Sequence, residues 1–337
     1  MDTTLFLGLL LIALGAFASS SFSIPFVKIK NWNWENYWLV CSLSAFIVCP
    51  IIITIITVPQ FAAIYKETEF STIINIFFCG ILYTIGSLSF GLMLRYLGVS
   101  LGYALGIGLT MSLGTLLPPL VDGRLFQMVG TSVFVNLISG VAISFVGILL
   151  SGVAGYRRSK ESNQGDSAEL NYPKGAVMAL IVGLTGSIFS FGLEQGNVLR
   201  GVAVRHGANP LFCENLVLVP LLFGTFLVTL IWCLYLGWRL KSNKNFLKKD
   251  KYLFSNYFYA SLAGVLWYIQ FLLFGMGKSK MGEYTFIAWG VLMSLTIVFA
   301  TFWGMYRKEW KGSSVTSKVM IWTSIILIMI AAVIMSV

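Results

Sequence analysis

Ten long stretches of this sequence contain no Asp, Glu, Lys, Arg or His, and few folds tolerate that pattern. They are Thr3–Val27, Asn36–Val58, Ser71–Leu94, Tyr96–Val121, Leu125–Tyr156, Gly175–Leu193, Asn215–Trp238, Tyr252–Gly277, Tyr284–Tyr306 and Val319–Val337. Each is close to or above the roughly 20 residues that a membrane-spanning helix needs. Backbone groups in lipid must be bonded within the segment, and the runs are continuous rather than alternating, so helices are favoured over barrel strands. The sequence predicts an all-α integral membrane protein with ten transmembrane helices.

The composition agrees with this prediction. Only 11% of residues are charged and 57% are hydrophobic, whereas soluble domains carry about 25% charged residues. The net charge of +10 would suggest nucleic-acid binding in a soluble protein. Here the basic residues lie in short loops, so membrane topology explains them better and no nucleic-acid partner is expected. The five cysteines form no CxxC pair, which argues against a metal or disulfide framework.

The basic residues also predict the orientation. Of the 23 Lys and Arg residues, 17 fall on one side of the ten predicted spans. The positive-inside rule places that side in the cytoplasm. Because the number of spans is even, both termini should then lie outside, in the periplasm.

The longest polar loop divides the chain into two equal groups of spans. Residues 157–174 form a predicted cytoplasmic linker between five spans in 1–156 and five in 175–337. Five is odd, so the two halves would insert with opposite orientations. Secondary transporters commonly contain such inverted repeats. The predicted fold is therefore two inverted five-helix repeats.

Motifs for other activities are absent from the sequence. It has no Walker, GxSxG or HExxH motif and a single histidine, His206, in a predicted loop. No catalytic residue, metal site or cofactor is expected, and the protein is not predicted to be an enzyme. Eight glycines lie in the third and fourth spans between Gly80 and Gly114, and Gly98, Gly102 and Gly106 follow a small-xxx-small spacing. They predict close helix packing, and such helices could also slide during alternating access.

Polar and aromatic side chains inside the spans are the candidates for substrate binding. Trp267 and Gln270 are three residues apart and share one helix face. An amide in lipid is costly unless it is bonded, and sugars are bound by amides at their hydroxyls and by aromatic rings against their C–H faces. The alternative is an interfacial aromatic with an interhelical hydrogen bond. The weaker candidates are Tyr284, Trp289, Ser89, Ser87 and Asn75.

Three carboxylates near the outer ends of spans are the candidates for proton coupling. They are Glu194, which we place first, then Glu283 and Glu214. Acids beside a membrane can take up protons near neutral pH because desolvation disfavours their charge. The alternative is that each is interfacial and solvated.

One long motif resembles a known family. Residues 21–38 read SFSIPFVKIKNWNWENYW, and this pattern, SFxxPFxKxKxWxWExxW, is similar to that of the bacterial L-rhamnose–proton symporter family of the drug/metabolite transporter superfamily. Further matches are Met93–Ser100, Leu266–Phe271 and Lys308–Trp310. The resemblance implies a drug/metabolite transporter fold in a bacterial inner membrane. It also implies uptake of L-rhamnose, or of a related sugar such as L-lyxose, with a proton as the coupling ion. Phe22 of the motif becomes a further candidate substrate contact.

The resemblance leaves some points open. Thr285, Glu194 and Glu214 depart from the pattern of enterobacterial members, so the coupling acid is not assigned by it. A sodium-coupled sugar transporter, an exporter or a permease for another small metabolite are the alternatives. Export of cationic drugs would want a buried acid in the first span, and none is present. We expect a monomer or a weak dimer in the lipid bilayer.

Overall fold

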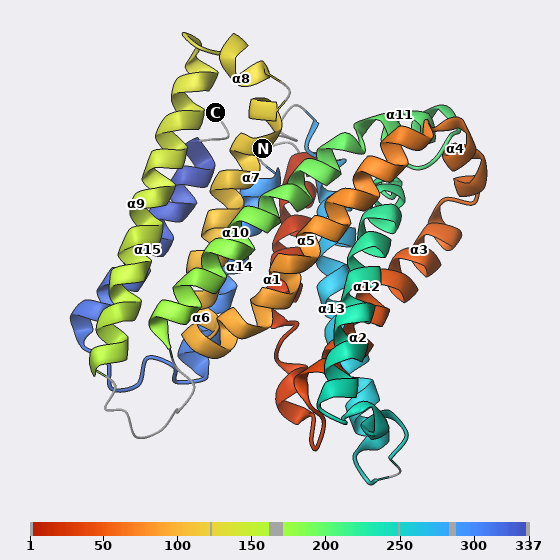
Figure 1. The fold of residues 1–337 in the computed structure, drawn as a ribbon. Coiled ribbons are helices and arrows are strands. Elements are labelled where there is room, and N and C mark those ends of the chain that lie inside the picture. Colours follow the sequence, from red (N-terminus) through yellow and green to blue (C-terminus); the bar gives the residue numbers. More distant parts are fainter. Residues whose placement is uncertain (1–2, 122, 162–170, 249, 283–287, 335–337) are drawn as a thin grey trace.

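The computed structural model describes residues 3–121, 123–161, 171–248, 250–282 and 288–334. Within these ranges the chain is helical, without strands, and ten helices are long and apolar enough to cross a membrane (Figure 1). This confirms the predicted all-α membrane fold with ten spans.

The ten spans are built from the following elements. In chain order they are α1 (Thr3–Ser21) with η1 (Pro25–Lys28); α2 (Trp34–Leu43), η2 (Ser44–Val48) and α3 (Cys49–Thr57); α5 (Phe70–Leu97); α6 (Val99–Gly102), η3 (Tyr103–Ile107) and α7 (Gly108–Val121); α9 (Ser132–Glu161); α10 (Tyr172–Gln195); α12 (Cys213–Arg239); α13 (Leu253–Lys278); α14 (Ala288–Tyr306); and α15 (Val315–Ile334). Short helices between them are α4 (Phe61–Glu67), α8 (Arg124–Gln127), α11 (Asn197–Arg205) and η4 (Asn243–Phe246). Spans two and four each contain one π-helical turn, η2 and η3, a feature that is frequent at functional sites.

Two predicted span boundaries are wrong. The break between spans three and four does not fall at Arg95: α5 continues to Leu97, and Gly98 ends it with a left-handed φ of +80°. A long Arg side chain can extend from the last turn of a helix toward water, so it need not end the span. The fifth span begins at Ser132 rather than Leu125, because Gly130, at φ +89°, separates it from α8.

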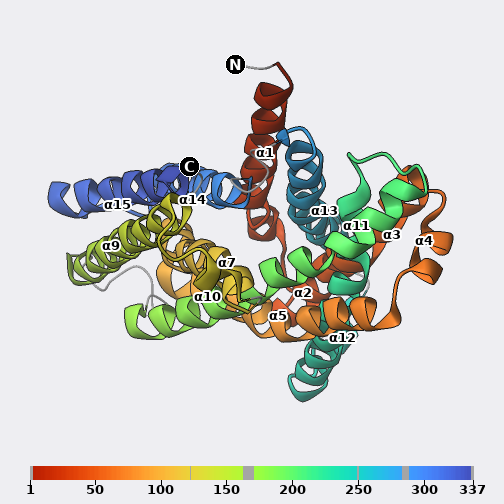
Figure 2. The ribbon, with the colours of Figure 1, turned by 90° about the horizontal axis from the view of Figure 1, so that it is seen from above.

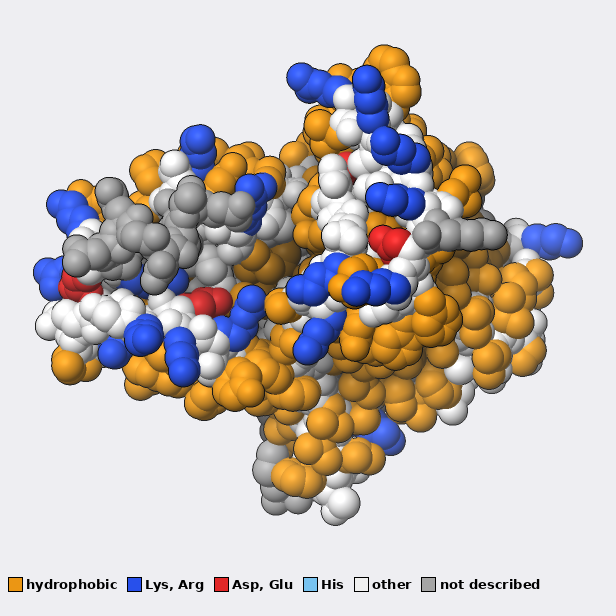
Figure 3. All heavy atoms as spheres, turned by 90° about the horizontal axis from the view of Figure 1, so that it is seen from below, with side chains coloured by type: hydrophobic (Ala, Val, Ile, Leu, Met, Phe, Trp, Pro, Cys, Tyr) orange, Lys and Arg blue, Asp and Glu red, His pale blue; other side chains and the backbone are white. Residues whose placement is uncertain are grey.

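The bundle has two distinct ends. The first helix begins and the last ends at the same end, which we call the terminal end (Figure 1). The opposite end, where α1 ends and α2 begins, carries many Lys and Arg side chains (Figure 3) and is called the basic end. Which end faces the cytoplasm stays a prediction.

Helices of the first half pack mainly on helices of the second half. The most extensive contacts join α5 to α10 and α12, α1 to α13 and α14, α7 to α10, and α9 to α15. Spans three and six are α5 and α10. Their counterparts in the other half are spans eight and one, α13 and α1, and these two also pack on each other. An inverted repeat predicts this pattern, and the repeat with its boundaries at 1–156 and 175–337 remains a prediction.

Spans three and seven approach each other at glycines. A Cβ added at Gly80 would lie 1.8 Å from the carbonyl oxygen of Leu221, and one at Gly224 would lie 2.2 Å from that of Phe77. The Thr225 hydroxyl donates to the Gly80 carbonyl at 3.0 Å. The predicted close packing around Gly80 is therefore confirmed.

Gly80→Ala should destabilise the protein. The added methyl meets backbone rather than a flexible side chain, so α5 and α12 must separate, at a cost of about 1–3 kcal/mol. The thermal unfolding midpoint of the purified protein in detergent should fall accordingly. Gly201→Ala in α11 is the control, since the nearest atom to its added Cβ is an Arg205 nitrogen at 4.0 Å. Equal midpoints for both variants would contradict the packing argument.

Candidate functional site

A cavity lies among spans one, two, three, four, six, eight and nine. It holds about 640 Å³ of empty space, part of it continuous with the surroundings. Its lining residues are Ser19, Phe22, Trp38, Tyr83, Gly86, Ser87, Phe90, Tyr103, Ile107, Thr110, Val182, Gly186, Phe189, Trp267, Gln270, Phe271, Trp289 and Met293. None of these lining residues carries a formal charge, and half of them are aromatic.

Five of the predicted substrate residues line this cavity, one of them being Ser87 of α5. Trp267 and Gln270 of α13 both line it, as their spacing predicted, together with Trp289 of α14 and Phe22. Gln270 is only 4% exposed, and its side-chain amide makes no hydrogen bond within the described ranges of the chain. Helix packing thus leaves the amide available to a ligand.

Two indole N–H groups at the cavity also lack partners. The Nε1 atoms of Trp38 and Trp289 are buried, and neither donates a hydrogen bond to any residue that the structure describes. Leaving a buried donor unpaired costs about 1–3 kcal/mol. The Tyr103 hydroxyl of the same wall, by contrast, donates to the Ser19 carbonyl at 2.9 Å. These unpaired donors belong to residues of the cavity wall, and a ligand oxygen that reached them would satisfy them.

Aromatic rings form most of the remaining wall. The Phe22 and Phe90 rings lie 5.9 Å apart, and the Phe90 and Tyr103 rings 5.3 Å apart. The Trp267 ring packs against Phe46 at 4.9 Å with its plane tilted by 74°. Apolar rings with a few unpaired donors suit a neutral molecule that has both hydroxyls and C–H faces. A charged ligand would lose its hydration without gaining a counter-ion.

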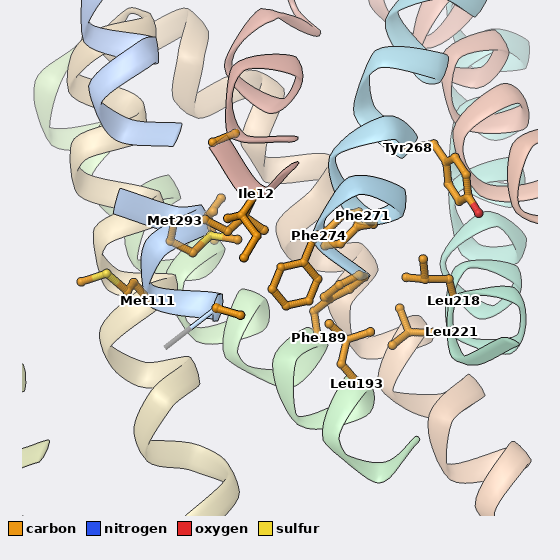
Figure 4. Close-up of a cluster of buried hydrophobic side chains, with 14 of the residues drawn as sticks. Ile12, Met111, Phe189, Leu193, Leu218, Leu221, Tyr268, Phe271, Phe274 and Met293 are labelled. Atoms are coloured by element: carbon orange, nitrogen blue, oxygen red, sulfur yellow. The ribbon is translucent and has the colours of Figure 1, made fainter. Parts of the chain in front are cut away.

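The cavity is closed toward the terminal end. Phe189 and Phe271 line it, and Leu193 and Phe274 follow one turn further along α10 and α13 (Figure 4). These side chains belong to one buried apolar cluster with Ile12, which is fully buried. No more than 4% of Leu193 or Phe274 is exposed. An apolar layer thus separates the cavity from the terminal end.

A second cavity continues toward the basic end. It holds about 750 Å³ of empty space, and Arg95, Arg307 and Glu309 are among its lining residues. Figure 3 shows a recess between two groups of helices on this face. Phe22 and Trp38 line both cavities, so their rings form the partition between them. Phe22 and Trp38 therefore lie between the central cavity and the cavity at the basic end.

Two of the weaker candidates, Ser89 and Asn75, are not among the lining residues. The Ser89 hydroxyl donates to the Ile85 carbonyl of its own helix at 2.7 Å, and Ser89 is not a lining residue. Ser87 does line the cavity, whereas Asn75 is exposed on α5. Tyr284 lies outside the described residues.

Two of the predicted coupling acids, Glu194 and Glu214, are not among the cavity-lining residues. Glu194 is half-buried near the end of α10, and Glu283 lies outside the described residues. Glu214, in the first turn of α12, is 5% exposed, and its Oε2 atom accepts a hydrogen bond from Arg200 at 2.9 Å. Its other oxygen is buried without a partner in the part of the chain that the structure describes. Arg200 also donates to the Leu193 carbonyl at 3.1 Å, so this ion pair lies beside the apolar layer.

The single histidine lies at the terminal end, in contact with Glu67. Its Nε2 atom is 2.6 Å from the Glu67 carboxylate, which also accepts a hydrogen bond from Arg205 at 2.9 Å. Hydrogen bonds from Arg205 and His206 hold the pKa of Glu67 below its usual value. These contacts join α4 to α11, on the surface and away from the cavity.

Several lining residues were not predicted from the sequence. Trp38 is the last Trp of the shared motif, and that position was the one available signal for it. Tyr83, Thr110 and Phe189 have no such signal, because single aromatic and hydroxyl residues are ordinary inside apolar spans.

Within the described ranges, ten helices are able to span a membrane and seven of them line a neutral cavity, which is the architecture of a polytopic membrane transporter. A family model, L-rhamnose-proton symport protein (RhaT), matches residues 1–337. The chain is 30% identical over 319 residues to the L-rhamnose-proton symporter of Cronobacter sakazakii, covering 92% of this chain and 91% of that protein. It is 29% identical over 322 residues to the L-rhamnose-proton symporter of Yersinia pestis, covering 93% and 92%. The chain therefore belongs to the L-rhamnose-proton symport protein family, whose members are symporters rather than enzymes.

Proposed function

We propose that this protein imports L-rhamnose, or a closely related sugar such as L-lyxose, together with a proton. The observation that carries the proposal is the neutral central cavity with its unpaired donors and aromatic walls. The relatives from Cronobacter sakazakii and Yersinia pestis are both named L-rhamnose-proton symporters, which supports the sugar and the coupling ion.

The sugar is held by donors and by rings. The Gln270 amide and the indole N–H groups of Trp38 and Trp289 donate to sugar oxygens, and the amide oxygen accepts from a hydroxyl. The Trp267 ring packs against a C–H face. Phe22 lies on the side of the basic end, where the sugar leaves the cavity.

Transport follows alternating access in this proposal. With the basic end in the cytoplasm, the structure corresponds to a state closed to the outside. Separation of α10 from α12 and α13 opens the apolar layer, and the two repeats rock around the cavity. Each proton that enters contributes about 2.3 kcal/mol per 100 mV of membrane potential. That is equivalent to a sugar gradient of about fiftyfold.

Glu194 is proposed as the proton-carrying acid, with Glu283 as the second candidate. Glu214 is the third, because its ion pair with Arg200 fits a role in closing the terminal end better than a role in carrying a proton. In Glu194→Gln, accumulation of labelled sugar should be lost while exchange of internal for external sugar continues. Unchanged accumulation would remove Glu194 from this role.

Sugar-induced alkalinisation tests the function as a whole. L-rhamnose added to lightly buffered cells that produce the protein should raise the external pH, and cells without it should give no change. A panel of labelled sugars measured in the same cells identifies the preferred substrate. Uptake that requires sodium and leaves the pH unchanged would show that the coupling ion is sodium rather than a proton. Absence of any sugar uptake would leave the alternative of a transporter for another metabolite.

A further inference from the structure

The end of α12 and its connection to α13 form a strongly basic corner. Residues 239–251 contain six Lys or Arg residues and one acid. Seen from above, α12 projects from the rest of the bundle (Figure 2), and basic side chains gather on this projection in the view from below (Figure 3). We call residues 237–248 the α12 corner.

The α12 corner encloses a hollow with a uniform charge. The hollow contains about 850 Å³ of empty space, open to the surroundings, and is lined by Gly237, Trp238, Arg239, Lys241, Asn243 and Lys244. Three of these are exposed cations, and no carboxylate lines the hollow. Glu35, which accepts a hydrogen bond from the Ser242 hydroxyl, is 4% exposed and is not a lining residue. The chemistry of the hollow is that of an anion site.

One of the three cations occupies a strained backbone position. The helix ends in a Schellman arrangement, in which the amide of Ser242 donates to the Gly237 carbonyl at 2.9 Å and that of Lys241 to the Trp238 carbonyl at 3.2 Å. Lys241 is the left-handed residue of this arrangement, at φ +55°. Glycine is the favoured residue there, because any other side chain raises the energy of this conformation. Lys308 adopts the same conformation after α14, at φ +58°.

The hollow is preformed by contacts with the first repeat. The Asn36 amide donates to the Ser242 carbonyl at 3.1 Å, and the Asn245 amide donates to the Asn36 side chain at 3.1 Å. A Cβ at Gly237 would lie 1.8 Å from the Asn243 side chain, so the missing side chain allows η4 to fold back on α12. The cations are therefore held on an ordered turn.

An exposed apolar strip leads from the hollow along α12. It consists of Ile231, Trp232, Tyr235 and Trp238, which are 63%, 44%, 46% and 74% exposed. The strip lies within a membrane span, so lipid chains cover it. Cations at the end of such a strip match a lipid with an anionic headgroup, because clusters of Lys and Arg beside a span attract anionic lipids.

We propose that the α12 corner binds an anionic phospholipid, with the phosphate between Arg239, Lys241 and Lys244 and the acyl chains along the apolar strip. The proposal does not depend on which solute the protein transports. The favoured occupant is a lipid rather than a free anion, since the hollow and the strip are continuous at Trp238.

Binding of phosphatidylglycerol to the purified full-length protein tests this site. Native mass spectrometry in a neutral detergent, with phosphatidylglycerol and phosphatidylcholine added in parallel, measures the apparent affinity for each. We expect preferential binding of phosphatidylglycerol. Lys241→Gly should weaken that binding about fivefold while raising the thermal midpoint of the lipid-free protein, because glycine relieves the strain. The triple variant Arg239→Gln, Lys241→Gln, Lys244→Gln should lose the preference.

A matched variant separates this site from a general effect of basic loops. Arg157→Gln, Lys160→Gln, Lys174→Gln removes three exposed cations from other positions at the basic end and should keep the preference. Equal losses of the preference for phosphatidylglycerol in the two triple variants would contradict the proposed site. Inorganic phosphate that competes as well as the lipid would show a free-anion site and would also overturn the proposal.

Discussion

Gln270→Leu is expected to raise the half-saturating concentration of L-rhamnose by about tenfold or more. The amide is 4% exposed and has no hydrogen-bond partner within the described chain, so its donors and acceptor are available to the sugar. Losing its hydrogen bonds while the sugar hydroxyls stay buried costs at least about 1–2 kcal/mol, and 1.4 kcal/mol is tenfold in affinity. Initial rates of labelled uptake over a range of sugar concentrations measure the change.

The same variant distinguishes a binding role from a structural one. Leucine removes an unpaired polar group from a buried wall, so the thermal midpoint should stay the same or rise. An interhelical hydrogen bond, the alternative that the sequence left open, predicts a lower midpoint. Asn75→Leu is the control, because it removes an exposed amide from α5 and should leave both quantities unchanged. Normal uptake by Gln270→Leu would exclude the amide from the sugar site.

Glu214→Ala is expected to destabilise the folded protein by about 3 kcal/mol. It leaves the Arg200 guanidinium, whose side chain is only 16% exposed, without its carboxylate partner. Breaking a buried ion pair from one side costs about 3–5 kcal/mol, and the partial exposure of Arg200 favours the lower value. Chemical or thermal unfolding in detergent, with and without sugar, measures the loss.

The double variant Glu214→Ala, Arg200→Ala is the informative partner. It removes both charges, so it should recover most of the stability that Glu214→Ala loses. Glu67→Ala provides the surface control, since its pair with Arg205 is exposed on both sides and should contribute little. A double variant as unstable as Glu214→Ala would show that packing against Gly275, rather than the ion pair, carries the effect.

The membrane fold could be predicted because its cause is local in the sequence. Each span must satisfy its own backbone hydrogen bonds and present apolar side chains, so a run without charges is sufficient to find it. The boundaries of the spans were harder to predict, because a charged residue in the sequence need not coincide with the turn of the backbone. Arg95 interrupts the apolar run, but the backbone turn is made by Gly98, whose φ of +80° only the structure reveals.

The site could be predicted in part. Gln270 and Trp267 were found because an amide beside large aromatics is unusual in an apolar run. Ser87 lines the cavity and Ser89 does not, because two residues along an α-helix correspond to a rotation of about 200°, so the two serines face nearly opposite ways. Tyr83 and Thr110 meet the cavity through the packing of different spans, which no local pattern encodes.

The neutrality of the cavity wall has a consequence for retention of the sugar. A sugar that is phosphorylated after entry carries a charge that this wall would have to strip of water without offering a counter-ion. If the protein imports a neutral sugar as proposed, we expect the phosphate ester to be excluded from the return path, so phosphorylation inside the cell would retain the sugar. The same exclusion applies to uronic acids outside the cell, so they would not compete with the neutral sugar for entry.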